Sequence, residues 1–282
     1  MRALSSVALP GAVALPGVVR RALSTASIGW SSSITFATLG TAITTLVLVP
    51  GLNVLFTVLL GADLAANDTV RIGCATALIA TLSSVAAGIV ARVATDRWIG
   101  VFEYVCTARP VDAGYWLGAA AVPALLASVT GLSNVGIVWL LSLTAPSTGA
   151  TSGLLLGALA LMPVAVLGGV CLGVFAAGLG LYLSDPYTGS NFLSIILPVS
   201  AGVIVPVSTY PAWLAWLCSW VPGSRLVQVL DASGSIASST TPNLFALLAT
   251  DAALAVLYAA IGLGLTVLAA RRIRAGARAS LL

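Results

Sequence analysis

Between Asp112 and Asp185 the sequence contains no charged side chain, and a second charge-free run extends from residue 22 to residue 62. In soluble domains about a quarter of the residues are charged, so stretches of this length do not fit a water-exposed surface. The whole chain of 282 residues agrees, with 59% hydrophobic residues, 7% charged residues and a mean hydropathy of +1.10. The sequence therefore predicts an all-α integral membrane protein.

Six transmembrane helices in a single domain, residues 1–282, are expected, because about 20 apolar residues cross a bilayer. The spans are placed at residues 33–60, 72–91, 113–143, 153–183, 191–205 and 244–270. Pro50 and Gly51 are expected to bend the first span, and the turn formers of residues 144–152 separate the third from the fourth. Residues 17–30 are too short to span and are predicted to form an interfacial helix.

The arginines predict how the spans are oriented. With six spans both termini lie on the same side of the membrane, and placing that side in the cytosol leaves only Arg71 and Arg225 outside. The cytosolic side then holds ten arginines, which are Arg2, Arg20, Arg21, Arg92, Arg97, Arg109, Arg271, Arg272, Arg274 and Arg278. The positive-inside rule favours this arrangement, a multi-pass protein of a bacterial plasma membrane with cytoplasmic N- and C-termini.

Residues 92–118 are the longest polar passage in the chain, and they lie between the second and third predicted spans. Drawn as one helix, residues 91–107 carry Trp98, Val101, Phe102 and Val105 on one side. The opposite side carries Arg92, Asp96, Gly100 and Glu103. The pattern predicts an amphipathic helix along the cytosolic membrane surface, which receives force from a separate soluble protein. The alternative is a solvated face on which Arg92 and Asp96 form an i, i+4 pair.

Two further segments have a recognisable pattern. Pro206, Pro211 and Pro222 bracket a stretch with three tryptophans, including Trp213, which predicts an extracellular re-entrant or interfacial helix between spans five and six. In the fourth span small residues recur at multiples of four, at Gly153, Gly157, Ala165, Gly169, Gly173 and Ala177. This stripe could receive another helix, including one from a second subunit, or it could follow from composition alone.

A few isolated polar residues are candidates for a substrate path. Asn53, Asn134 and Gln228 could contact a substrate, or each could bond a neighbouring helix. Asp251 lies near the start of the last span, where an ionisable group is costly and often functional. It could instead lie at the outer headgroups or pair with Arg225. Cys74, Cys106, Cys171 and Cys218 are widely spaced and are expected to be small buried hydrophobes.

Residues 96–104, DRWIGVFEY, followed by TARPV at 107–111, resemble a pattern of the ABC-2 type permeases, the membrane subunits of ATP-driven exporters. That pattern is acidic-x-x-x-Gly-x-x-Glu followed by Ser/Thr-x-x-Pro, between spans two and three. Residues 206–214, PVSTYPAWL, and 220–223, WVPG, resemble the segment that follows span five in the same family. The chain departs from the family at Asp96, Val101 and Arg109, which bears on subfamily and substrate.

The resemblance implies a dimer, with a second copy or a paralogue, and one cytosolic ABC ATPase subunit on each permease. Asp96, Gly100, Glu103, Arg109 and Pro110 would then form the coupling segment that docks against the ATPase. ATP and Mg²⁺ would bind the partner, because this sequence has no lysine and no Gly-x-x-x-x-Gly-Lys-Ser/Thr loop. No cofactor or metal is expected on this chain. The apolar spans favour export of a hydrophobic or amphiphilic cargo, such as an antibiotic, drug or lipid.

Two other classes of membrane protein are less consistent with the residues. A membrane-embedded lipid-modifying enzyme needs convergent catalytic groups, whereas the eight acidic residues here are scattered and histidine is absent. An ion-coupled secondary transporter usually shows internal repeats and charges at mid-membrane. Nucleic acid is not expected as a partner, because the basic residues flank apolar spans. The sequence thus predicts a non-enzymatic permease subunit.

Overall fold

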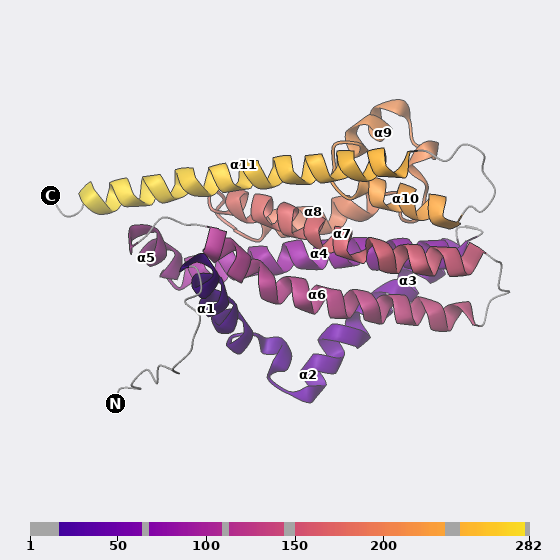
Figure 1. The fold of residues 1–282 in the computed structure, drawn as a ribbon, viewed down its shortest axis with the longest axis horizontal. Coiled ribbons are helices and arrows are strands. Elements are labelled where there is room, and N and C mark those ends of the chain that lie inside the picture. The colour runs from indigo at the N-terminus through magenta and orange to yellow at the C-terminus, as the bar shows by residue number, and fades with distance from the viewer. Residues whose placement is uncertain (1–16, 64–67, 109–112, 144–149, 235–242, 280–282) are drawn as a thin grey trace.

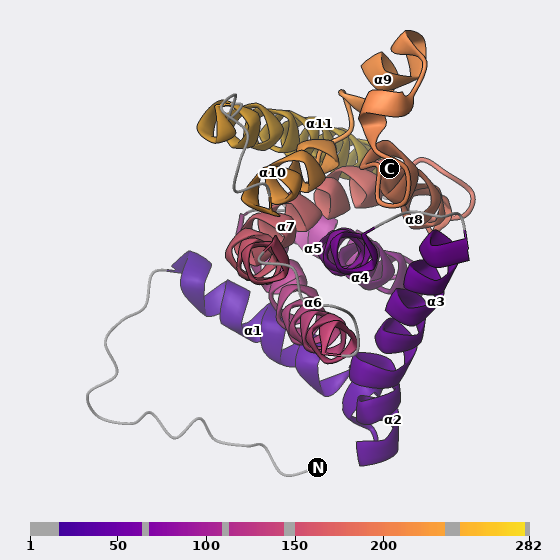
Figure 2. The same cartoon turned by 90° about the vertical axis from the view of Figure 1, so that its right-hand side faces the viewer.

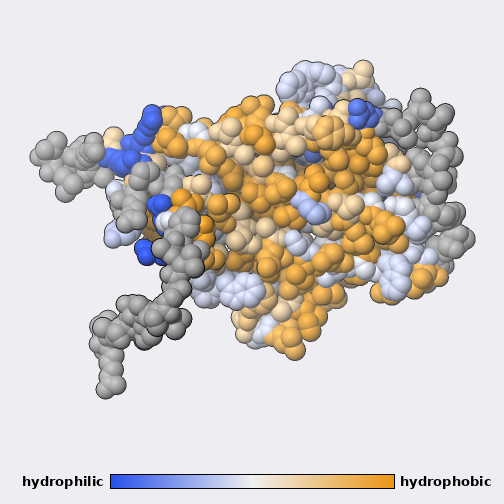
Figure 3. Space-filling model, in the orientation of Figure 1, coloured by the Kyte–Doolittle hydropathy of each residue, from blue (hydrophilic) through white to orange (hydrophobic). Residues whose placement is uncertain are grey.

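The computed structural model describes residues 17–63, 68–108, 113–143, 150–234 and 243–279. All regular structure in these ranges is helical (Figure 1). Five helices are long and apolar enough to cross a membrane, at Leu39–Asp63, Thr69–Trp98, Ala113–Ser142, Thr151–Gly180 and Leu244–Gly276. Hydrophobic side chains cover the middle of the bundle, and hydrophilic ones gather near its ends (Figure 3). The described structure therefore has the character of a multi-pass membrane protein.

The first long helix is bent, as Pro50 predicts, and the bend is a wide turn. Helix α2 (Leu39–Ile43) continues through a π-helical turn, η2 (Thr44–Leu48), into α3 (Val49–Asp63). Pro50 has no N–H, and its ring would collide with the carbonyl group four residues earlier in a regular α-helix. The wider turn relieves that collision. Gly51 then lets α3 approach α6, since an added Cβ would lie 2.5 Å from Cδ1 of Ile137.

Helix α4 (Thr69–Trp98) is the centre of the bundle. It packs against α3, α6 (Ala113–Ser142), α7 (Ala150–Gly180) and α8 (Thr188–Ser200), and Figure 2 shows it surrounded by them. In its most apolar window 67% of the residues are buried, against 17% to 39% in the other four long helices. Helix α4 continues beyond the predicted end of the second span at residue 91 and ends at Trp98, and a separate helix, α5 (Val101–Ala108), follows it. The expected single amphipathic helix over residues 91–107 is therefore wrong.

The small-residue stripe of α7 packs within the chain. An added Cβ at Gly169 would lie 2.6 Å from the carbonyl oxygen of Leu82, and one at Gly173 would lie 3.0 Å from Cα of Ala86, both on α4. Ala165 and Ala177 are also buried. Gly169 and Gly173 of the stripe therefore receive another helix, as expected, and that helix is α4 of the same chain. A use of the stripe between two subunits stays a prediction. A separate close contact, between Gly178 and Gly262, joins α7 to α11 (Leu244–Ala279).

The predicted fifth span is not formed as one helix. Helix α8 has 13 residues, about 20 Å at 1.5 Å per residue, whereas the hydrocarbon core needs about 30 Å. The chain turns at Gly202, where φ is +66°, and continues through η3 (Val207–Thr209), α9 (Ala212–Cys218) and α10 (Ser224–Gly234). The described structure therefore supports five spans plus a short helix, and six spans are not confirmed.

The prolines of residues 206–222 begin new elements. Pro206 precedes η3, and Pro211 precedes α9 and accepts hydrogen bonds from the N–H groups of Leu214 and Ala215. Pro222 is buried next to the start of α10. Of the three tryptophans, Trp213 and Trp216 lie on α9 and Trp220 follows it, and they are 65%, 61% and 50% exposed. The helix exists and its tryptophans face outward, while its position at a membrane surface stays a prediction.

The N-terminal helix α1 (Gly17–Ser31) forms where one was expected. It crosses α6, where Gly118 admits it: a Cβ there would lie 2.7 Å from the carbonyl oxygen of Ala22. Helix α1, the short helix α5 (Val101–Ala108) and the C-terminal end of α11 lie at the same end of the bundle (Figure 1). We call it the elbow end, after the bend between α4 and α5.

Candidate functional site

The elbow between α4 and α5 is built on Gly100. Its φ is +75°, a conformation that glycine adopts freely and other residues rarely. The N–H of Gly100 donates to the carbonyl of Arg97 (3.2 Å), and its own carbonyl accepts from Tyr104 (3.3 Å). No described atom lies within 4 Å of the position that a Cβ would take. The backbone turn thus requires glycine here, and the space outside it is open.

The predicted apolar face of this segment is divided between the interior and the surface. Phe102 is buried, and it packs with Tyr115 and Ala270 in one hydrophobic cluster. Trp98, Ile99, Val101 and Tyr104, by contrast, are 72%, 66%, 41% and 74% exposed. We call these four residues the elbow patch. Glu103 is exposed beside them, as predicted.

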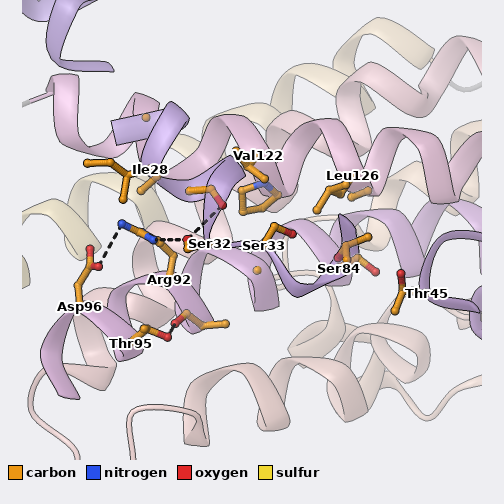
Figure 4. A pocket seen from close by; sticks show the side chains of 18 of the residues that line it. Ile28, Ser32, Ser33, Thr45, Ser84, Arg92, Thr95, Asp96, Val122 and Leu126 are labelled. Atoms are coloured by element: carbon orange, nitrogen blue, oxygen red, sulfur yellow. Dashed lines mark hydrogen bonds and ion pairs between the residues drawn. The ribbon is translucent and has the colours of Figure 1, made fainter. Parts of the chain in front are cut away.

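Asp96 is buried, with an exposed fraction of 2%, so its predicted position on an exposed helix face is wrong. The hydroxyl of Tyr115 donates to its Oδ2 (2.9 Å), and Nη2 of Arg92 lies 3.3 Å from its Oδ1. Nη1 of Arg92 donates to Oγ of Ser32 on the chain beyond α1 (3.1 Å). Figure 4 shows Arg92 between Asp96 and Ser32. The i, i+4 pair proposed from the sequence exists, and its hydrogen bonds join α4 to Tyr115 of α6 and to the turn that follows α1.

Arg97 ties the elbow to α7. Its Nη1 donates to the carbonyl oxygens of Gly180 (2.8 Å) and Leu183 (2.9 Å). Gly180 is the last residue of α7, and Leu183 lies just beyond it. The helix dipole places partial negative charge at this end of α7, so a cation is favourable there. Trp98 adds an edge contact to Tyr187, with ring centroids 5.9 Å apart. The elbow is thus held against α7 and the start of α8.

A cavity of ≈ 810 Å³ lies directly behind the elbow. Asp96, Ile99 and Val101 line it, so two members of the elbow patch face both the surface and the cavity. The remaining wall comes from α1, η2, the middle of α4 and α6. Its labelled members in Figure 4 are Ile28, Ser32, Ser33, Thr45, Ser84, Arg92, Thr95, Val122 and Leu126. A movement of the elbow would therefore change the shape of this cavity.

A second cavity, of ≈ 620 Å³, lies between α3, α4 and the segment from α8 to Tyr210. Asn53 lines it, and its place on a substrate path stays a prediction. Asn134 and Gln228 line neither cavity. Asn134 is buried on α6, where its Oδ1 has no partner among the described residues, and Gln228 is exposed on α10. The three candidates are thus not brought together.

The opposite end of the bundle holds a polar network that sequence reasoning missed. Arg71 at the start of α4 forms a two-pronged ion pair with Asp231 of α10 (2.7 and 2.9 Å). It also donates to the carbonyls of Val203 (3.1 Å) and Gly202 (3.3 Å). Asp251 accepts the N–H of Gly223 at 2.9 and 3.0 Å. Asp251 therefore has a structural role at the start of α10. The three residues that Arg71 contacts are too distant in sequence for any local signal.

Three remaining sets of candidates complete the comparison with the sequence. Arg109 and Pro110 lie outside the described residues. None of the four cysteines forms a disulfide, and Cys74, Cys106 and Cys218 are buried as expected. Burial raises the pKa of the Cys106 thiol, which keeps it protonated and unreactive at neutral pH. Within the described ranges no three acidic or cysteine side chains are grouped so as to hold a metal ion.

Comparison of the chain with models of known protein families gives no match. Comparison with curated protein sequences gives no significant match either. The resemblance to ABC-2 permeases therefore rests on the quoted motifs of this sequence and stays a prediction.

Proposed function

We propose that this chain is the permease subunit of an ATP-driven exporter of the ABC-2 type, located in a bacterial plasma membrane. It would work as a dimer, with a second copy or a relative, and each permease would bind a separate cytosolic ATPase that holds ATP and Mg²⁺. The cargo would be hydrophobic or amphiphilic. The chain itself would be no enzyme.

The observation that carries this proposal is the position of the elbow patch. Its four apolar side chains are exposed beyond the end of α4, beside the exposed carboxylate of Glu103. Large exposed apolar patches with polar neighbours are typical of protein contacts. Because Ile99 and Val101 also line the larger cavity, a protein that pressed on the patch would act directly on that cavity. This is what a coupling element must do.

The distribution of arginine supports a cytosolic position for the elbow. Helix α1, the last turns of α4 and the end of α11 meet at the elbow end (Figure 1). They carry seven described arginines, Arg20, Arg21, Arg92, Arg97, Arg271, Arg272 and Arg274, against Arg71 and Arg225 on segments at the other end. Positively charged segments are retained in the cytosol, so the ATPase would meet the elbow there.

The proposed mechanism uses the rigidity of α4. Closure of the ATPase on ATP would push the elbow patch, with Glu103 forming polar contacts at the interface. Gly100 would define the angle between α4 and α5, and the bonds of Arg97 to the end of α7 would pass the displacement to α7. The walls of the larger cavity would then shift, exposing its contents to the other side.

Affinity purification of the chain from its native host tests the proposal. A nucleotide-binding subunit should copurify, and it should hydrolyse ATP. The matched variants are Glu103→Ala at the elbow and Asp63→Ala at the exposed end of α3, and only the first should reduce retention of the ATPase. Amphiphile transport by the purified chain in vesicles that contain no ATPase would contradict the proposal.

A further inference from the structure

One stripe of α4 lines both cavities. Its residues at intervals of four are Thr76, Ala80, Ser84, Gly88, Arg92 and Asp96. A step of four residues turns by about 40° around an α-helix beyond one full turn, so the stripe winds gradually around α4 from one cavity to the other. Ile79 and Ser83 of the smaller cavity, and Ala91 and Thr95 of the larger one, fill the stripe at intervals of three or four. The two cavities are therefore lined by successive parts of the same helix.

Ser84 belongs to the wall of both cavities, so they meet at this residue. It lies at the middle of α4, and it is exposed. The lining from Thr76 to Asp96 rises by about 30 Å at 1.5 Å per residue. That length equals the hydrocarbon thickness of a typical bilayer, about 30 Å. The part of α4 that lines the two cavities is therefore long enough to cross the hydrocarbon core.

The lining of this route is mostly apolar and almost uncharged. Hydroxyl and amide side chains recur along it, at Ser32, Ser33, Thr45, Ser84, Ser83, Thr57, Asn53, Ser194 and Tyr210. Among the described residues, Arg92 and Asp96 are the only charged ones that line either cavity, and they form an ion pair with each other. A group with net charge would lose hydration along the route and gain no opposite charge beyond the pair.

We propose that the two cavities form one transfer route for the polar head of an amphiphile, and that this head is net neutral and rich in hydrogen-bonding groups. The Arg92–Asp96 pair at the elbow end supplies a donor and an acceptor for the head. Hydroxyl groups then replace its water along α4, with Ser84 at the midpoint. The proposal rests on the proposed function for the source of energy, and it adds the substrate class.

Leu46, Val49, Val122 and Leu126 provide the apolar part of the larger cavity, and Phe56 and Leu60 that of the smaller one. These side chains would contact the hydrocarbon or ring body of the amphiphile. Gly88 keeps the route narrow at one point, because it allows Pro123 of α6 to approach α4: an added Cβ would lie 2.7 Å from Cβ of Pro123.

Access to residue 84 is tested by cysteine labelling in phosphatidylcholine vesicles. The reagent is a sulfonate-bearing methanethiosulfonate, which does not dissolve in hydrocarbon. Ser84→Cys is compared with Leu125→Cys on α6, which is 50% exposed but lines neither cavity. The two positions lie at similar depth, because Gly88 faces Pro123 and Gly131 faces Thr81. Both variants carry Cys171→Ala, since Cys171 is the one native cysteine that is not fully buried.

The Ser84→Cys variant should be labelled at least tenfold faster than the Leu125→Cys variant. Equal rates at the two positions would overturn the route, since residue 84 would then face hydrocarbon. The measurement needs no ATPase and no transport. A failed copurification with intact labelling would therefore reject the proposed function alone, and slow labelling with intact copurification would reject the route alone.

The head-group class is tested by protection in the same vesicles. The probes are a decyl glucoside, decyl sulfate and decyltrimethylammonium, each below its solubilising concentration. The glucoside should slow labelling of the Ser84→Cys variant severalfold, and the two charged probes should not. Equal protection by a charged probe would contradict the neutral head, and no protection by any probe would contradict binding of amphiphiles in the route.

Discussion

Each end of the helix bundle holds an arginine–aspartate pair that includes α4, but the two pairs are built differently. Arg71 makes two short bonds to Asp231 and two more to backbone carbonyls. Arg92 has one contact of 3.3 Å with Asp96 and one hydrogen bond to Ser32, and its buried Nε has no partner among the described residues. The first pair closes its end of the bundle, whereas the second borders a cavity and leaves donors unused.

The difference shows how the same residue types serve structure at one end and allow rearrangement at the other. A guanidinium that makes four hydrogen bonds loses much by exchanging a partner, so the segments around Arg71 stay fixed. A guanidinium with unused N–H donors beside a cavity, such as that of Arg92, can exchange a partner for a ligand at little cost. We therefore expect variants at the closed end to lower stability, and variants at the elbow end to lower function. Four variants test this, ordered from the largest expected effect on stability to the smallest.

Arg71→Ala should have the largest effect. It removes every bond between α4, Asp231 and the turn at Gly202, and we expect a loss of roughly 2–3 kcal/mol in the free energy of unfolding. The value lies below that of a fully buried pair because the side chain of Asp231 is 38% exposed. Thermal unfolding in lipid nanodiscs measures it. Arg20→Ala, at an exposed position on α1, is the control, and equal stability of the two variants would contradict a structural clamp.

Asp251→Ala should cost about 2 kcal/mol, because the N–H of Gly223 would remain buried without an acceptor. Asp251→Asn keeps one acceptor oxygen and should cost less. The same unfolding measurement distinguishes them. A normal stability for Asp251→Ala together with a loss of transport would show that Asp251 is functional, and the closed end would then not be purely structural.

Asp96→Asn should lower stability by only about 1 kcal/mol, because Tyr115 can still donate to the side-chain oxygen. Arg92 loses its counter-charge, however, so the cavity wall behind the elbow changes. Transport of a fluorescent glycosylated amphiphile into vesicles with both subunits should fall severalfold. If this variant were as unstable as Arg71→Ala, the two ends would be equally rigid and the comparison would fail.

Glu103→Ala should change the free energy of unfolding by less than about 0.5 kcal/mol, since Glu103 is exposed on a short helix. Transport in the same vesicles should nevertheless fall severalfold, because polar contacts to the ATPase are lost. Asp63→Ala is the matched control, as another exposed carboxylate at the end of a helix. Unchanged transport by the Glu103 variant would remove Glu103 from the coupling surface.

Helix positions were predictable where a long charge-free run specifies them. The third, fourth and last predicted spans agree with α6, α7 and α11 to within a few residues at most of their ends. The end of α4 was misplaced because Arg92 and Asp96 suggested a surface, while in the fold they neutralise each other within the bundle. The fifth span was overestimated because the turn at Gly202 interrupts it after α8.

The candidate site was predictable in part. The motif around Gly100 and Glu103 correctly predicted an exposed carboxylate at Glu103, whereas the helix break at Gly100 was not predicted. The burial of Asp96 could not be inferred, because it depends on a hydroxyl from Tyr115 on another helix. The cavities could not be inferred either, since α1, η2 and α6 approach α4 from separate parts of the chain.

The sequence by itself determined that the chain is helical and membrane-like, where most of its long helices lie, and that arginine is concentrated near certain helix ends. These follow from a local property, namely the transfer free energy of consecutive side chains. Only the tertiary structure decided which arginine makes four hydrogen bonds, which carboxylate is buried and which residues of α4 line the cavities. Those outcomes depend on distances between helices, and a distance between helices is set by packing along the whole bundle.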